Sequence, residues 1–234
     1  MRRLTKAKKG GCGWQMGEVA FSDQRMGPDV TSASPAEVFA AIEQLPPELD
    51  WKSVAPRVVP LFERVRPYPR GAPARAQAIV APGVTVGFGI DIGPAFLTVS
   101  PELVESWSLS VADLAAHALA NLHAVAGKVD SSEVKRAPLA GVDVDALQTR
   151  RGIGSVLVLA PTELGRIFGR QRGLFIAPMR DLLIRFPHDA DPELAAWLYE
   201  EIASSDPNCL APRAFLFDGR SVTVEALNAP LLAA

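Results

Sequence analysis

The sequence predicts an α+β fold, with a mostly antiparallel sheet packed by several helices. Apolar runs rich in β-branched and aromatic residues come in pairs, most clearly 214–217 and 221–225 on either side of Asp218-Gly219. An Asp-Gly between two such runs is a strong hairpin signal. Between the pairs, segment 111–126 carries apolar residues at helical spacing. Paired strands separated by helices favour an antiparallel sheet over regular βαβ winding.

Composition indicates a globular chain with a core of its own. The chain has 234 residues, 48% hydrophobic and 21% charged, which is a length and balance that can bury a sizeable core. Its two cysteines, Cys12 and Cys209, are too few for a disulfide framework. No apolar run reaches the roughly 18–20 residues that a membrane span needs. We therefore expect a cytoplasmic protein with no membrane partner.

Charge and composition divide the chain into three parts. Residues 1–34 form an irregular basic arm, 35–75 a helical segment, and 76–234 an α+β body expected to make one domain with 35–75. The arm has no acid before Glu18 and no apolar run after its bases, so no secretory signal is expected. It could contact phosphates or an acidic partner, although a solvated tail is the favoured interpretation. Because 24 bases nearly cancel 26 acids, nucleic acid is not expected as a partner.

The helical segment has one clear helix and one interrupted helix. Ser34-Pro35 provides an N-cap and a proline at the first helical position, which begins a helix ended by Pro46-Pro47. A second helix is predicted over 51–66, kinked or broken by its internal prolines.

The first half of the body reads as strands followed by helices. Two adjacent strands divided by Gly-Pro are predicted within 84–99, then a short helix from Ser100 to Trp107. Ser110 and Asp113 form a capping signature for the helix 111–126. The polar segment 127–153 is predicted as a long loop, of a kind that is often functional or disordered.

The second half alternates strands and helices. We predict a buried strand at 155–160, a helix over 161–172, two apolar strands or one bent strand at 173–178 and 181–186, a helix over 191–202, and the hairpin 214–225.

Glycine-rich stretches do not match nucleotide-binding motifs. Gly87, Gly89 and Gly93 are spaced one residue too far apart for a dinucleotide loop, and a strand rather than a helix follows. No cofactor is expected.

Metal-ligand and nucleophile patterns are also missing. His117 and His123 are six residues apart and so point to different sides of a helix, whereas His188 stands alone beside a proline. No G-x-S-x-G elbow occurs. We expect no metal, and both cysteines are interpreted as structural or incidental.

Four polar residues stand where apolar ones are expected, and these are the candidate binding residues. Asp91 interrupts an apolar strand, Arg180-Asp181 separates two apolar strands, and Asn121 lies near the apolar stripe of the helix 111–126. A buried charge must be paired or hydrogen-bonded. Arg180 could therefore pair with Asp181 or Asp91 as a structural ion pair, which is the favoured alternative to a binding site.

The same positions carry a family resemblance. PAFLTVSPELVESWSLSVADLAAHALANL (94–122), GIGSVLVLAPTEL (152–164), GLFIAPMRDLLIRFP (173–187) and CLAPRAFLFDGRSVTV (209–224) resemble successive blocks of the bacterial YtpQ-like family of unknown function. The Arg180-Asp181 and Asn121-Leu122 pairs are the most specific matches. The resemblance implies an α+β fold and a cytoplasmic bacterial protein, but no established activity, substrate or cofactor.

Two functional hypotheses remain. The first is an uncharacterised, non-catalytic binding or interaction module with an unidentified protein or small-molecule partner, because no complete catalytic constellation is found. The alternative is an enzyme in which Asp91, Asp181 and Glu163 supply acid–base groups and Arg180 holds an anion. Whether the protein is an enzyme stays open at this point.

Overall fold

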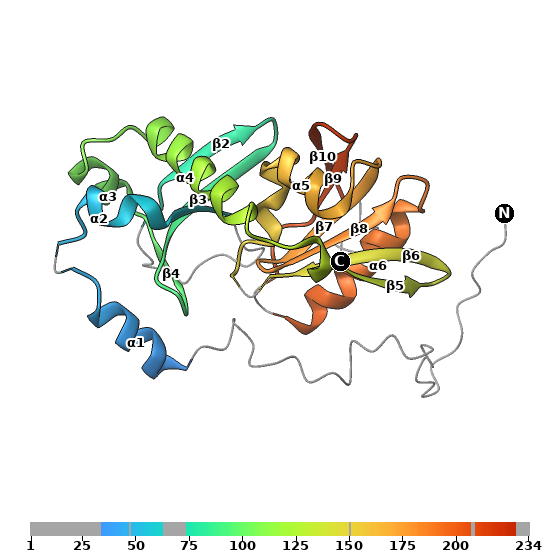
Figure 1. Ribbon diagram of the computed structural model, residues 1–234, viewed down its shortest axis with the longest axis horizontal. Coiled ribbons are helices and arrows are strands. Elements are labelled where there is room, and N and C mark those ends of the chain that lie inside the picture. Colours follow the sequence, from blue (N-terminus) through green and yellow to red (C-terminus); the bar gives the residue numbers. More distant parts are fainter. Residues whose placement is uncertain (1–33, 47, 63–73, 150, 207–208, 228–234) are drawn as a thin grey trace.

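Two antiparallel sheets, with helices on their faces, make up the structure, so the α+β prediction is confirmed (Figure 1). It is a computed structural model that describes residues 34–46, 48–62, 74–149, 151–206 and 209–227. Apart from Ser34, the predicted basic arm lies outside the described residues.

The four-stranded sheet is built around its longest strand, β3. This strand pairs antiparallel with each of the other three strands. The strands are β1 (Val58–Phe62), β2 (Gln77–Ala81), β3 (Val84–Asp91) and β4 (Phe96–Thr98). The predicted pair of strands within 84–99 corresponds to β3 and β4, whereas no strand was predicted at the position of β2.

The six-stranded sheet consists of three hairpins joined edge to edge in the order β10-β9-β7-β8-β6-β5. Its strands are β5 (Lys135–Leu139), β6 (Val142–Gln148), β7 (Gly173–Met179), β8 (Leu182–Pro187), β9 (Arg213–Phe217) and β10 (Val222–Ala226). The β9–β10 hairpin was predicted, and of the two alternatives for 173–186, a hairpin or one bent strand, the structure has the hairpin β7–β8.

The helices cover the sheets on defined faces. Helix α4 lies across one face of the four-stranded sheet and α6 across one face of the six-stranded sheet (Figure 1). The α-helices are α1 (Pro35–Glu43), α2 (Trp51–Val54), α3 (Pro101–Ser106), α4 (Val111–Ala126), α5 (Pro161–Phe168) and α6 (Pro192–Ser205). Short 3-10 turns are η2 (Ala55–Arg57), η3 (Ser131–Glu133) and η4 (Ser155–Leu159).

Two apolar cores hold these layers together. The larger core joins both sheets through the buried face of α4, η4 and α5, and includes stacked rings of Phe62 on β1 and Phe215 on β9, 5.6 Å apart. The smaller core lies between the six-stranded sheet and α6 and includes Phe186 and Tyr199. Because the larger core contains residues of both sheets, the two sheets form one packed unit.

The predicted helix over 51–66 is wrong beyond its first turns. Helix α2 ends at Val54, η2 follows, and the chain continues as β1, all of whose residues are buried. Pro56 is accommodated within the 3-10 turn, and Pro60 within a strand that pairs with β3. The segment 35–75 is therefore not wholly helical. Burial of Val58-Val59 on a sheet outweighs the helical spacing.

The predicted loop 127–153 is also wrong, because it contains the β5–β6 hairpin. Ala140 and Gly141 both have positive φ, 50° and 83°, which is the backbone of a type I′ turn. Type I′ turns usually contain Asn-Gly or Asp-Gly. Because alanine stands at the first of these two positions here, the sequence did not indicate the turn. On β5, Lys135, Arg136 and Pro138 protect an edge strand.

The third correction concerns 155–160, which is the 3-10 turn η4 and not a strand. Four of its residues are buried between α4, β1 and the β7–β8 hairpin. A short apolar run has no periodicity that distinguishes a buried strand from a buried helical turn. The helix that follows, α5, is shorter than predicted because Gly169, with φ of 83°, ends it.

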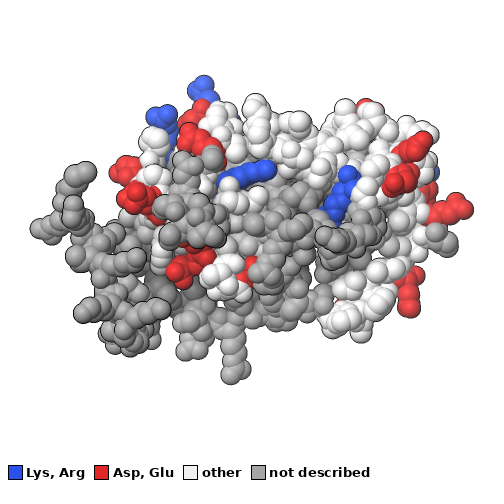
Figure 2. Space-filling view, turned by 180° about the vertical axis from the view of Figure 1, so that it is seen from behind, with Lys and Arg blue, Asp and Glu red and all other residues white. Residues whose placement is uncertain are grey.

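Charge is unevenly distributed over the molecule. Residues 34–234 carry 18 bases and 23 acids, whereas the arm 1–33 carries six bases and three acids. In Figure 2, acidic side chains gather toward both ends of the face shown, and single basic side chains lie between them. Among the described residues, no helix combines the length and hydropathy that crossing a membrane demands.

Candidate functional site

Two of the four candidate binding residues are used to build the four-stranded half. The Nδ2 group of Asn121 donates hydrogen bonds to the backbone carbonyls of Ala55 (2.6 Å) and Val58 (2.8 Å), and so fixes α4 to the start of β1. Oδ1 of Asp91 accepts a hydrogen bond from the backbone N–H of Gly93 at 2.8 Å, in the turn between β3 and β4. Both contacts are the kind that organise backbone.

The other two residues form the β7–β8 turn. Asp181 is 2% exposed, and its Oδ2 accepts from Nε2 of Gln148 at 3.5 Å. The carbonyl of Arg180 accepts from the N–H of Ser155 at 2.9 Å. Gly154 packs so closely that a Cβ there would lie 2.4 Å from the carbonyl oxygen of Asp181. This turn therefore clamps η4 against the sheet, and only glycine fits at position 154.

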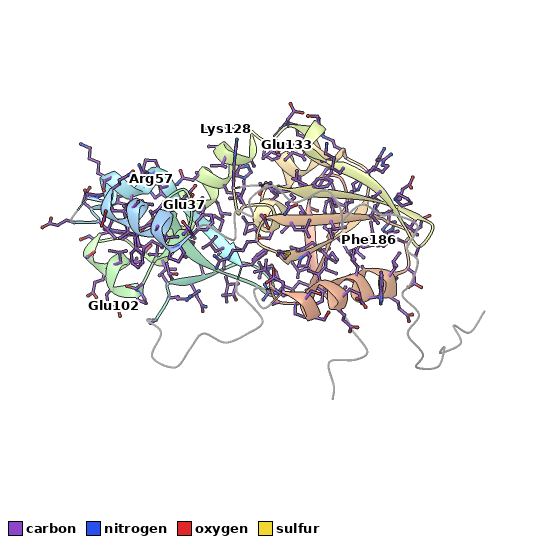
Figure 3. The ribbon with its side chains drawn as sticks, turned by 90° about the horizontal axis from the view of Figure 1, so that it is seen from below. Glu37, Arg57, Glu102, Lys128, Glu133 and Phe186 are labelled. Atoms are coloured by element: carbon purple, nitrogen blue, oxygen red, sulfur yellow. The ribbon has the colours of Figure 1, made fainter. Side chains whose placement is uncertain are left out.

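A charged row crosses the six-stranded sheet on the face opposite α6. Cross-strand pairing places Arg136 of β5 beside Asp145 of β6, Asp145 beside Arg185 of β8, and Arg185 beside Phe175 of β7. Phe186, labelled in Figure 3, follows Arg185 and belongs to the core on the α6 side. Because side chains alternate along a strand, Arg185 points to the opposite face.

Arg185 is the most deeply buried charge of this row, with a side chain 9% exposed. Its Nη1 donates to the carbonyl of Phe168 at 2.7 Å and to Oδ2 of Asp145 at 3.4 Å, and its Nη2 donates to Oε1 of Gln171 at 3.3 Å. Burial lowers the pKa of Arg185 from its ordinary value, and Asp145 opposes that shift. Gly173 leaves room for the guanidinium, since a Cβ there would lie 2.9 Å from Nε.

Asp145 is shared by two arginines. Nε of Arg136 donates to its Oδ1 at 2.8 Å and Nη2 to its Oδ2 at 3.5 Å, while Arg185 reaches Oδ2 from the other side. The hydrogen bond to Asp145 raises the pKa of Arg136. Two guanidinium groups on one carboxylate leave a formal charge of +1 at the centre of the row.

A pocket of about 400 Å³ opens over this row. Its exposed rim adds two acids, Asp143 and Asp189, one base, Arg172, and the imidazole of His188. Volumes of this size are typical of small-molecule sites. A second pocket, of about 370 Å³, lies beside the β9–β10 turn and is lined mainly by exposed residues, including Arg170 and Arg220. None of the four candidate binding residues lines either pocket.

Other reactive side chains are occupied structurally. Cys209 is 4% exposed, and burial raises the pKa of its thiol, which disfavours the thiolate. The hydroxyl of Tyr199 donates to the carbonyl of Leu210, and burial raises its pKa as well. Cys12 lies outside the described residues.

Histidines show no ligand geometry. His117 packs edge-on against Trp51, with ring centroids 5.0 Å apart, and His123 is exposed on α4. Within the part of the chain that the structure describes, no three His, Cys, Asp or Glu side chains come close enough to hold a metal ion.

Sequence reasoning missed Arg136, Asp145 and Arg185. Arg185 is one charge inside the apolar run of β8, and that was a usable signal. Asp143 and Asp145 alternate with valines, which indicates one polar face once 142–148 is recognised as a strand. The interpretation of 127–153 as a loop concealed both signals.

A comparison of the chain with protein-family models, with curated proteins and with solved structures finds no match in any of the three.

Proposed function

We propose that this protein is a non-catalytic binding module whose ligand presents an anionic group to the pocket over β5, β6 and β8. The observation that carries the proposal is the buried guanidinium of Arg185. Arginine has five N–H donors, and three of them serve Asp145, Phe168 and Gln171. The N–H of Nε and one N–H of Nη2 donate to no described residue, so donors remain for an oxyanion.

The charge balance of this row, in which Arg185 is buried and Arg136 is 68% exposed, supports an anionic ligand. Burying charged groups costs free energy that an ion pair often fails to recover. Asp145 neutralises only one of its two arginines. The positive charge left at the floor attracts carboxylate or phosphate groups, which a guanidinium can bind with two parallel hydrogen bonds.

The lining supports binding without turnover. Its described residues include no serine, threonine or cysteine that could act as a nucleophile. The enzyme alternative relies on Asp91 and Asp181, with Arg180, and no observation favours it, because these residues serve turns and lie outside the pocket lining. Membership of the YtpQ-like family, a bacterial origin and a cytoplasmic location remain part of the proposal, supported by the sequence blocks given above and by the scarcity of cysteine.

The test is a ¹⁵N–¹H NMR titration with inorganic phosphate and with glutarate. We expect saturable shifts at residues 143–145, 171–173 and 185–189. In Arg136→Gln the affinity should fall roughly tenfold, because the variant removes the net positive charge of the row and two unit charges about 4 Å apart interact by about 1–4 kcal/mol. The matched control is Arg220→Gln, which removes an exposed arginine from the other pocket. Shifts scattered over the surface and equal in both variants would contradict the proposal.

A further inference from the structure

We infer that the ligand of this pocket is a small zwitterion whose anionic and cationic groups are several ångströms apart, of the dipeptide or ω-amino-acid class. The inference rests on the proposed function and adds a second contact to it. It comes from the way charge is distributed along the pocket, which has a cationic floor and an acidic end.

The cationic floor is fixed by the cross-strand row. Arg185 and Asp145 are buried, and Arg136 chelates the same carboxylate from β5, so the three side chains carry a formal charge of +1. Arg185 is fixed in position, because its guanidinium donates hydrogen bonds to the carbonyl of Phe168 and to Gln171, whereas the side chain of Arg136 is 68% exposed. An anionic group is therefore favoured at this end.

The acidic end lies further along the same strands. Asp143 is two residues before Asp145 and so projects from the same face of β6, about 7 Å away along the strand. Asp189 lies two residues beyond Pro187, the last residue of β8, and both acids are exposed at the pocket. Neither makes an ion pair or a hydrogen bond with another described side chain, although the pKa of Arg136, raised mainly by its hydrogen bond to Asp145, also receives a small electrostatic contribution from the charge of Asp143. A cationic group is favoured here.

One further cation lines the pocket, and it is shared with a neighbouring turn. The guanidinium of Arg172 acts electrostatically on Asp218 in the β9–β10 turn and contributes to the lowered pKa of that carboxyl, although hydrogen bonds from Ser221 and Arg220 contribute more. With Arg172 included, the described lining holds three guanidinium groups and three carboxylates, and their formal charges balance. The pocket remains dipolar, positive at Arg185 and negative at Asp143 and Asp189.

The separation of these charges selects the ligand class. In an α-amino acid, the ammonium and carboxylate are held on one carbon. They cannot span the distance of about 7 Å along β6 that separates Asp143 from Asp145, the cross-strand neighbour of Arg185. An extended dipeptide places its terminal charges about 6–7 Å apart. A pocket of about 400 Å³ also has room for such a molecule.

The experiment uses four probes that differ in their end groups, titrated into the full chain by NMR. They are glycylglycine, N-acetylglycylglycine, glycylglycinamide and glycine. We expect glycylglycine to bind at least tenfold more tightly than each of the other three. Asp143→Asn should remove the advantage of the free ammonium without weakening N-acetylglycylglycine. Glu105→Gln, which removes an exposed acid on α3, is the matched control and should change neither probe.

The outcomes separate this inference from the proposed function. If N-acetylglycylglycine binds as tightly as glycylglycine and Asp143→Asn changes neither, the zwitterion inference is wrong and the anion site stands. If glycine equals glycylglycine, the charge separation is wrong. If no anionic probe, phosphate included, shifts the pocket residues, the proposed function itself fails.

Discussion

At the scale of single residues, the sequence predicted which polar side chains need a partner, but not which partner each of them finds. Asn121 was a candidate for binding, and in the structure it bridges α4 to two carbonyls at the start of β1. Arg185 was not among the predicted binding residues, and it lies at the floor of the pocket. The type of a residue shows that it needs a partner, but the partner is supplied by a strand or helix far away in the sequence.

The structural role of Asn121 can be tested directly. In Asn121→Ala, the carbonyls of Ala55 and Val58 lose the side-chain amide that bridges them, although Ala55 still accepts from the N–H of Val58. We expect the free energy of unfolding to fall by about 1–3 kcal/mol. Asn121→Asp should be at least as damaging, because its carboxylate would face two carbonyl oxygens. Urea denaturation measures both effects. Phosphate affinity of the folded variants should stay unchanged, and a selective loss of ligand affinity at full stability would instead return Asn121 to the binding site.

At the scale of elements, helices were predicted correctly where the sequence contains both the capping residues and the apolar pattern of the helix. Both α1 and α4 begin with a capping box, Ser34 with Glu37 and Ser110 with Asp113, and both were predicted. The β5–β6 hairpin was missed because alanine stands in a turn that usually shows Asn or Asp. The strand β1 was missed because its conformation is decided by pairing with β3, a strand that is distant along the chain.

The two capping boxes should respond differently to the same substitution. Helix α1 buries none of its residues, so its helicity depends on local interactions, whereas α4 is held by four buried side chains. We expect Ser34→Ala to reduce the helical Cα chemical shifts of 35–43 and leave global stability unchanged. Ser110→Ala should preserve α4 but lower the free energy of unfolding by about 1 kcal/mol. Equal losses of helicity in both variants would contradict this.

The carboxylate of the α1 box gives this prediction a pH dependence. A hydrogen bond from the backbone of Ser34 lowers the pKa of Glu37 below its model-compound value of 4.5. The stabilising contribution is therefore present above pH 4.5 and is lost as the pH falls through the lowered pKa. The helical shifts of 35–43 should decline over that range in the wild type, and Glu37→Gln should be insensitive to pH there.

At the scale of the whole molecule, the two sheets share one core, and this predicts cooperative unfolding. Phe215 of β9 stacks on Phe62 of β1, so Phe215→Ala should cost about 3–5 kcal/mol and weaken both halves together. In a Trp14→Phe, Trp197→Phe background, the two remaining tryptophans, Trp51 and Trp107, report on the half that contains the four-stranded sheet. Their fluorescence midpoint in urea should coincide with the far-ultraviolet circular dichroism midpoint, with and without Phe215→Ala. Separated midpoints would show that the sheets unfold independently.

The sequence by itself determined the fold class, the capped helices and the β9–β10 hairpin with its Asp-Gly turn. It did so because these depend on interactions between residues close together along the chain. Tertiary structure alone decided that 58–62 is a strand, that 155–159 is a buried 3-10 turn, and that Arg136, Asp145 and Arg185 meet across three strands. These features depend on which strands become neighbours. The pocket therefore became visible only when strand pairing had brought its charges together.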